Sequence, residues 1–142
     1  MNLICTYGIC PKNPGMGSWG YVIVINGETV CECLGVELKT TSNRIELMSI
    51  IRGISGYINI SEDKYVTVQS NSVNVVNAFN KDWVRRWRQK GWITREKKPV
   101  AAVELWDQLL SFTKDLRVTW EKADKSAWNN RAEFLAWEGI KK

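Results

Sequence analysis

The sequence has 142 residues, of which 44% are apolar and 25% charged, proportions typical of a single globular domain spanning residues 1–142. No apolar run approaches the ~20 residues that cross a bilayer, and no secretory signal opens the chain, so we expect a cytoplasmic protein without a membrane partner. The four cysteines form no C-x-x-C pair and are expected to be buried, reduced thiols. Histidine, the usual general acid or base, is absent.

The positive charge is concentrated in one segment. The chain carries a net charge of +5, and residues 81–98 hold eight basic and two acidic residues, so the rest of the chain is nearly neutral. Trp83, Trp87 and Trp92 interleave with these charges. This pattern is typical of a nucleic-acid-binding surface, where cations meet phosphates and an indole packs on a sugar or base. The alternative is a solvated basic helix whose tryptophans pack inward.

Apolar periodicity predicts alternating strands and helices along the chain. Strands are expected over residues 2–8, 19–25, 29–36, 65–69 and 116–120. Helices are expected from Ser42 or Asn43, over residues 73–79, in the basic segment as far as Lys90, and over 127–140. A further helix is expected to have Pro99 in its first turn. This order predicts an α/β protein with a five-stranded mixed sheet, in which an antiparallel unit of strands 1-2-3 is followed by parallel strands reached through helices.

Particular residues mark the expected ends of these elements. Asn26-Gly27 is a strong two-residue hairpin signal between the second and third strands. Asn43 and Glu46 have capping-box spacing at the start of the first helix. Ser70 or Asn71 is expected to cap the second helix.

These elements and their local sequences resemble type 1 ribonuclease H, the bacterial ribonuclease HI family. The resemblance covers nearly the whole chain and rests on TYGICPKNPGMGSWGY, TTSNRIELM, VQSNS, WVRRWRQKGWITREKKPVAAVELW and NNRAEFLA. It implies a ribonuclease H-like fold, a five-stranded mixed sheet flanked by helices, with residues 81–98 as a basic, Trp-rich helical protrusion. It also implies cleavage of the RNA strand of an RNA–DNA hybrid by two divalent cations that four carboxylates hold.

The resemblance assigns the four carboxylate positions to residues of which two are not acidic. Tyr7 and Asn71 stand at the first and third positions, Glu46 keeps the second, and Glu133 replaces a shorter aspartate at the fourth. A neutral phenol and amide contribute no charge, so two negative charges remain against two Mg²⁺ ions. We therefore expect a catalytically inactive member with Glu46 and Glu133 as remnants of the metal site. No cofactor is expected, and Mg²⁺ or Mn²⁺ would be required only for residual activity.

Each of these four residues also has a structural interpretation. Glu46 fits a capping carboxylate at a helix start, and Glu133 fits a solvated carboxylate on a helix. Asn71 is a good helix N-cap. Tyr7 is expected to fill the emptied pocket as a buried aromatic with a satisfied hydroxyl.

The binding residues of the family are better preserved than its carboxylates. The resemblance assigns two groups to nucleic-acid contact: Cys10, Asn13, Asn43 and Arg44 in the minor groove of the hybrid, and Trp83, Arg86, Trp87, Arg88 and Lys90 on the DNA strand. Ser42 and Val73 depart from the family pattern at two contact positions.

Three functions follow as hypotheses. The first is a module that binds RNA–DNA hybrid, or duplex RNA or single strands, through the basic patch without cutting them. The second is a weak metal-dependent ribonuclease H that uses Glu46, Glu133 and the nearby Asp124. The third is a regulatory subunit that reuses the old substrate surface to bind a protein partner, with an exposed tryptophan as anchor.

Overall fold

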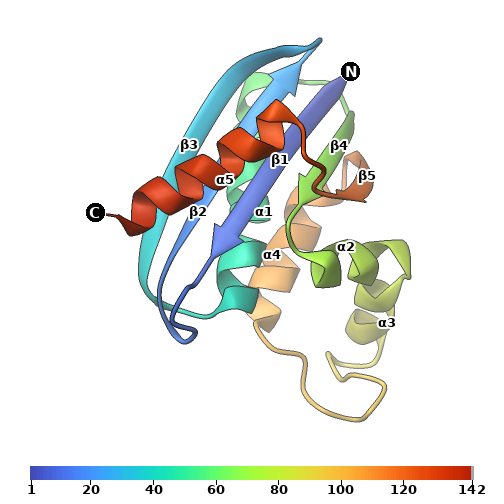
Figure 1. The fold of residues 1–142 in the computed structure, drawn as a ribbon. Helices are drawn as coiled ribbons and strands as arrows, with labels where there is room; N and C mark the ends of the chain where they lie inside the picture. The colour runs from blue at the N-terminus through green and yellow to red at the C-terminus, as the bar shows by residue number, and fades with distance from the viewer. Residues whose placement is uncertain (142) are drawn as a thin grey trace.

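A five-stranded sheet in the order β3-β2-β1-β4-β5 organises the computed structural model, which describes residues 1–141 (Figure 1). The strands are β1 (Asn2–Ile9), β2 (Gly15–Ile25), β3 (Glu28–Thr40), β4 (Tyr65–Ser70) and β5 (Arg117–Lys122). The helices are α1 (Ser42–Ile60), α2 (Val73–Asn80), α3 (Trp83–Gln89), α4 (Val103–Thr113) and α5 (Ala127–Ile140). Lys142, the last residue of the expected domain, lies outside the described residues.

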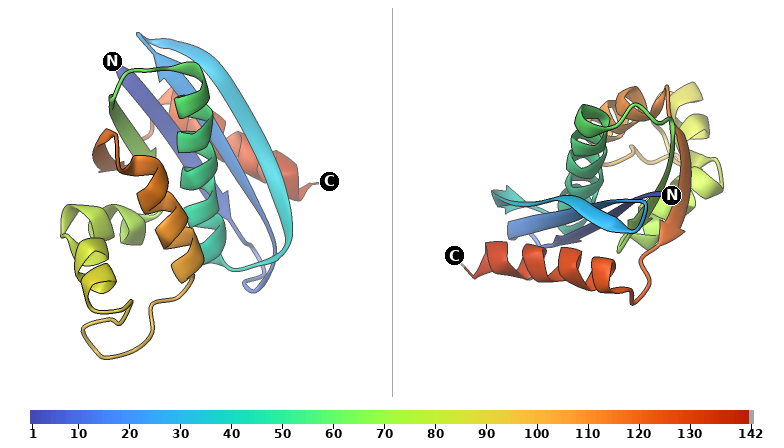
Figure 2. Two further views of the ribbon diagram at one scale, coloured as in Figure 1. Left: turned by 180° about the vertical axis from the view of Figure 1, so that it is seen from behind. Right: turned by 90° about the horizontal axis from the view of Figure 1, so that it is seen from above.

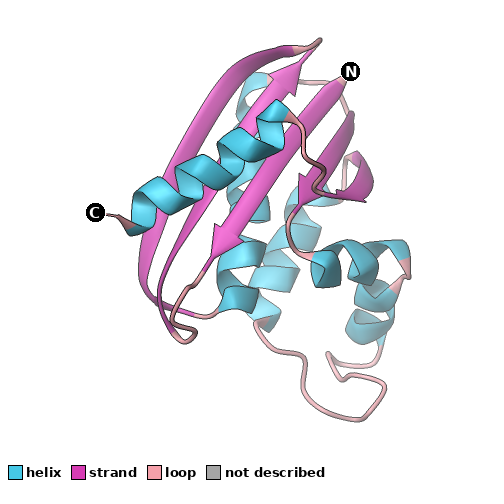
Figure 3. Cartoon of the chain, in the orientation of Figure 1, coloured by secondary structure: helices cyan, strands magenta, loops and turns pink. Residues whose placement is uncertain are grey.

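The sheet is mixed, as the sequence predicts (Figure 3). β1, β2 and β3 pair antiparallel, whereas β4 pairs parallel to both β1 and β5. Asn26 and Gly27 have φ angles of 53° and 81°, the left-handed geometry that a two-residue hairpin requires. β2 and β3 continue pairing well beyond the predicted ends, so the loop after β1 is shorter than predicted.

Helices cover the two faces of the sheet unequally. α5 packs alone across β1, β2 and β3, whereas α1 lies on the opposite face with α4 against it (Figure 2). Residues 17–24 of β2 are all buried because helices cover both sides of this strand. The larger apolar cluster lies on the α1 side, and a smaller cluster lies under α5. Both layers meet at β1, which carries part of the site described below.

α1 begins at Ser42, as predicted, but its cap is not the predicted one. Thr41 is the N-cap, and its hydroxyl accepts a hydrogen bond from the backbone N–H of Arg44 at 3.2 Å. Asn43 lies inside the first helical turn, so the expected capping box between Asn43 and Glu46 is wrong. Because Glu46 is not used as a cap, its carboxyl is available to the site.

The cap of α2 and the start of α4 also differ from the predictions. Ser72, not Ser70 or Asn71, caps α2 by accepting a hydrogen bond from the N–H of Val75. Pro99 pairs with Ile93 in an isolated β-bridge, and α4 begins only at Val103. The prediction that Pro99 occupies the first turn of a helix is therefore wrong.

The cysteines are free thiols with unequal burial. Cys5 and Cys10 are buried, Cys31 is half-buried and Cys33 is exposed on the edge strand β3. The expectation of four buried thiols thus fails for Cys31 and Cys33, which lie on the edge strand β3. No helix within residues 1–141 combines the length and apolar character needed to span a membrane.

Candidate functional site

Four segments meet where β1 and β4 end, and they bring together the four residues singled out as a carboxylate set. Tyr7 lies near the end of β1, and Asn71 directly follows β4. Glu46 lies in the second turn of α1, and Glu133 lies on α5. The carboxyl ends of parallel strands share one edge of a sheet, which is where α/β proteins commonly place their sites.

Gly8 is the point at which three of these segments touch. The Asn71 side chain accepts a hydrogen bond from Gly8 N at 3.1 Å and donates one to Gly8 O at 2.9 Å. A Cβ at Gly8 would lie 2.7 Å from the carbonyl oxygen of Ile45 and 2.8 Å from the Cα of Glu46. Only glycine permits this approach, so β1 lies directly against the start of α1 while Asn71 fixes it from the β4 side.

Tyr7 and Glu133 form a hydrogen-bonded pair between β1 and α5. The Tyr7 hydroxyl donates to Glu133 Oε2 at 3.1 Å. Burial raises the pKa of Tyr7, and the hydrogen bond and charge of Glu133, together with the charge of Glu46, raise it further. The phenol is therefore neutral and acts as a donor, which confirms the prediction of a satisfied hydroxyl. Tyr7 is half-buried, and Glu133 is not simply a solvated carboxylate.

Glu46 is the second carboxylate of this cluster. It is half-buried, and burial raises its pKa while a hydrogen bond with the Ser72 side chain partly offsets that effect. Sequence reasoning did not single out Ser72 as a partner, although its position next to Asn71 is a usable signal. Asp124 is engaged elsewhere, because its Oδ1 accepts hydrogen bonds from Ser126 N and Asn129 Nδ2 at the start of α5.

The donor set of this cluster does not fit a pair of Mg²⁺ ions. Both polar atoms of the Asn71 amide are bonded to Gly8, and the Tyr7 hydroxyl is bonded to Glu133. Only two carboxylates remain, whereas hard divalent cations require several anionic oxygens. Over residues 1–141, no three His, Cys, Asp or Glu side chains are grouped so that they could hold a metal ion.

The basic protrusion contains a groove with a volume of about 460 Å³. Its walls are formed by α3 and the following loop, through Trp83, Arg86, Trp87, Lys90, Ile93, Thr94, Arg95 and Glu96. Trp87 also packs edge-on against the buried Trp106, with ring centroids 5.4 Å apart. The tryptophans therefore pack inward and also line the groove, and their contact with nucleic acid stays a prediction. Sequence reasoning did not single out Ile93 or Arg95.

Among the described residues, most cations of the protrusion have no acidic partner. Arg85 forms an ion pair with Asp82, and Arg86 donates hydrogen bonds to the carbonyls of Lys81 and Asp82. In the described part of the chain, Arg88 and Lys90 are exposed and form no ion pair. Their charges are therefore available to an anionic ligand.

The other predicted contact residues have varied environments. Cys10 is buried, with its thiol near the carbonyls of Gly15 and Thr40. Asn13 accepts a hydrogen bond from the first N–H of α1 and thus anchors the loop after β1. Arg44 forms an ion pair with Glu104 of α4, which the sequence did not predict. Nucleic-acid contact by these residues stays a prediction.

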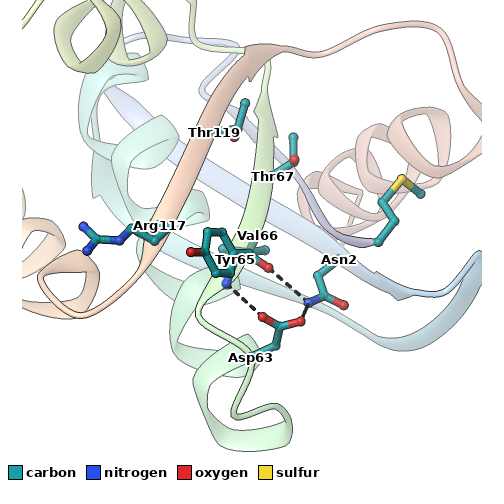
Figure 4. A pocket seen from close by; sticks show the side chains of 8 residues that line it. Asn2, Asp63, Tyr65, Val66, Thr67, Arg117 and Thr119 are labelled. Atoms are coloured by element: carbon teal, nitrogen blue, oxygen red, sulfur yellow. Dashed lines mark hydrogen bonds between the residues drawn. The ribbon is translucent and has the colours of Figure 1, made fainter.

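A second hollow, of about 290 Å³, lies at the opposite edge of the sheet, where β1, β4 and β5 begin (Figure 4). Asn2 Nδ2 donates to Asp63 Oδ2 at 2.8 Å and to the Tyr65 carbonyl at 3.1 Å, so these polar groups satisfy one another. This hollow is separate from the cluster around Gly8 and from the protrusion.

Comparison with known proteins identifies similar sequences over the full length. The family model described as RNase H matches residues 2–141. A protein named ribonuclease H from Chlorobaculum parvum is 38% identical over 141 residues, which cover 97% of this chain and 94% of that protein. A ribonuclease H from Thermoanaerobacter pseudethanolicus is 37% identical and covers 98% of this chain and 89% of its own length.

Solved structures share the same fold. LC11-RNase H1, determined in complex with RNA/DNA hybrid, superposes with a TM-score of 0.79 at 22% identity, covering 99% of this chain and 97% of that one. A foamy viral protease-reverse transcriptase, also in complex with RNA/DNA hybrid, gives a TM-score of 0.80 at 21% identity over 97% of this chain and 20% of that one. At such identities the likeness concerns the fold alone.

Proposed function

The chain belongs to the ribonuclease H family, and from that premise we propose that it binds RNA–DNA hybrid, or a related nucleic acid, without cutting it. The observation that carries the proposal is the state of the cluster around Gly8. Two of the four positions that the family uses for carboxylates hold the neutral Tyr7 and Asn71, and both are hydrogen-bonded within the protein. The basic protrusion beside this cluster supplies the nucleic-acid contacts.

The loss of cleavage follows from charge. A pair of Mg²⁺ ions carries four positive charges, and their mutual repulsion must be offset by nearby anionic oxygens. Glu46 and Glu133 supply only two negative charges, and burial raises the pKa of Glu46, which weakens its anionic form further. Under this proposal, the chain keeps the nucleic-acid-binding surface of the family and lacks its metal-dependent cleavage.

The retained binding function is supported by the protrusion. Residues 81–98 carry most of the positive charge of the chain, and two indoles stand beside the unpaired cations. Hybrid is the favoured partner because two structural relatives were determined in complex with RNA/DNA hybrid. Duplex RNA and single strands are the related ligands that the same phosphate contacts would accept.

We also propose that the protein acts in the cytoplasm. Four free thiols, one of them exposed, suit a reducing compartment. Fractionation of the native host cell, with detection of the chain by antibody, would test this location.

A titration against hybrid, duplex RNA, duplex DNA and single strands, with and without Mg²⁺, tests the proposal. We expect hybrid to bind without Mg²⁺, and the Trp83→Ala/Arg86→Ala variant to weaken that binding at least about tenfold. The matched control is Trp137→Ala/Arg117→Ala, which removes the same residue types from exposed sites outside the protrusion. Unchanged binding by the first variant, or equal loss by the control, would contradict the proposal.

A weak metal-dependent ribonuclease is the second candidate. Its support is that the relatives at 35–38% identity are named ribonuclease H and that Glu46 and Glu133 remain in the cluster. The test is cleavage of hybrid at high protein and Mn²⁺ concentrations, with Glu46→Gln as the control for contaminating nucleases. Cleavage by the natural chain that Glu46→Gln abolishes would establish this function.

A further inference from the structure

The groove in the protrusion has the size and lining of a small-molecule site. Its volume of about 460 Å³ falls within the range of about 300–1,000 Å³ in which such ligands bind. Trp83, Trp87 and Ile93 give it an apolar wall, while Arg86, Lys90 and Arg95 outnumber the single acid Glu96. A ligand that fits must therefore combine a flat apolar body with negative charge.

The aromatic wall is held rigidly from below. The Trp87 ring packs against Trp106, which is 1% exposed, and the Trp83 ring lies 6.3 Å from that of Trp87 at an angle of 37°. Lys81 lies 5.6 Å from the Trp83 ring centroid. Because the indoles are already positioned, a stacking ligand would not have to order them on binding.

The lining residues after α3 belong to a hairpin that is held by its own hydrogen bonds. Thr94 N donates to Lys98 O at 2.8 Å, and Lys97 N donates to Thr94 O at 2.9 Å. Ile93 pairs with Pro99 at the base of this hairpin. Within residues 1–141, Lys90 and Arg95 make no ion pair, so both cations that line the groove are available to a phosphate.

We propose that this groove binds one unpaired nucleotide, with its base on the indole wall and its phosphate at Lys90 and Arg95. The inference rests on the proposed nucleic-acid binding and specifies its ligand. Bases inside a duplex are stacked on both faces, so an indole can reach the face of a base only where the strand is single. The protein therefore favours a hybrid that carries a single-stranded overhang over a blunt one.

Two hybrids of identical duplex sequence test this inference, one blunt and one with a short oligothymidine overhang. We expect the overhang to tighten binding about fivefold or more, the effect of one base stacked on an aromatic side chain. A third hybrid carries the same overhang with abasic sites, which keeps the phosphates but removes the bases. It should bind like the blunt hybrid.

Two variants locate the effect on the protein. Arg95→Gln and Ile93→Ala should remove the overhang preference, since both residues line the groove. Lys98→Gln loses the same charge on the same hairpin but does not line the groove, so it should keep the preference.

If the blunt hybrid and the hybrid with an overhang bind equally well, this inference alone is overturned. If the overhang and its abasic form bind equally, the contact is with phosphates only, and the inference is again overturned. A chain that binds none of these nucleic acids would overturn both proposals.

Discussion

At the scale of single residues, internal hydrogen bonds hold the side chains of the site in place. Tyr7 donates to Glu133, and the Asn71 amide satisfies both backbone groups of Gly8. An aspartate at position 71 could accept from Gly8 N, but it would present a second oxygen to Gly8 O where Nδ2 now donates. The neutral side chains of Tyr7 and Asn71 are therefore matched to the hydrogen-bonding groups that they face.

Removal of the Tyr7 hydroxyl tests how much its hydrogen bond to Glu133 stabilises the fold. Tyr7→Phe keeps the ring but leaves the half-buried Glu133 without its donor, and we expect the free energy of unfolding to fall by about 0.5–1.5 kcal/mol. Urea unfolding at neutral pH checks this. Tyr65→Phe is the matched control, because this ring is 70% exposed. Equal stability of Tyr7→Phe and the natural chain would count against the hydrogen bond.

Glu46 gives the stability of the fold a pH dependence of known sign. Burial raises the pKa of Glu46 above its ordinary value of 4.5, so the folded chain binds the proton more readily than the unfolded chain. Its contribution to stability therefore declines as pH rises through the interval from 4.5 to the raised pKa. Above the raised pKa, the folded chain bears the full free-energy cost of burying the ionised carboxylate.

Glu46→Gln should remove that cost. At pH 7 we expect the variant to be more stable by less than about 1 kcal/mol, since solvent still screens the half-buried carboxyl. The difference should shrink as pH falls toward 4.5. Thermal unfolding across this range, with the exposed Glu62→Gln as control, checks the sign. A Gln variant that is less stable at pH 7 would contradict the burial argument.

At the scale of elements, the site depends on the close approach of β1, α1 and the end of β4. Gly8→Ala would place a methyl group 2.7 Å from the carbonyl oxygen of Ile45, which forces β1 and α1 apart. We expect a loss of about 1–3 kcal/mol, the usual effect of overpacking a close contact. Denaturant unfolding gives the magnitude, and an unchanged midpoint would show that α1 can shift freely.

Local sequence predicts the type of each element better than its limits. α5 spans Ala127–Ile140 as predicted, and the Asn26-Gly27 hairpin is confirmed, because apolar spacing and left-handed turn geometry are local properties. The predicted cap of α2 and the predicted start of α4 were wrong because contacts with residues elsewhere in the chain determine where these helices begin. Pro99 is drawn into a bridge with Ile93, so that the helix begins later.

For the site, too, the sequence predicted which residues belong together but not the long-range contacts that they make. Resemblance to a family placed Tyr7, Glu46, Asn71 and Glu133 at related positions, and the structure brings them to one edge of the sheet. The partners that set their chemistry could not be predicted, because Tyr7 and Glu133 are 126 residues apart and Arg44 and Glu104 are 60 apart. Pairing at such separations is a property of the folded chain.

At the scale of the whole molecule, charge is separated between a nearly neutral body and the basic protrusion. If three to five cations of residues 81–98 neutralise phosphates, the logarithm of hybrid affinity should fall against the logarithm of salt concentration with a slope of about −3 to −4.5. Arg86→Ala should reduce that slope by about 1. Titrations at several salt concentrations measure both values, and a flat response would exclude phosphate contact.

Diffraction from a crystal soaked in Mn²⁺, recorded at a wavelength where manganese scatters anomalously, tests most directly whether the site between Glu46 and Glu133 holds a pair of metal ions. Manganese accepts the same oxygen ligands as magnesium and can be located without ambiguity. We predict no pair of ordered ions between Glu46 and Glu133. Two well-ordered ions bridged by Glu46 would contradict the account.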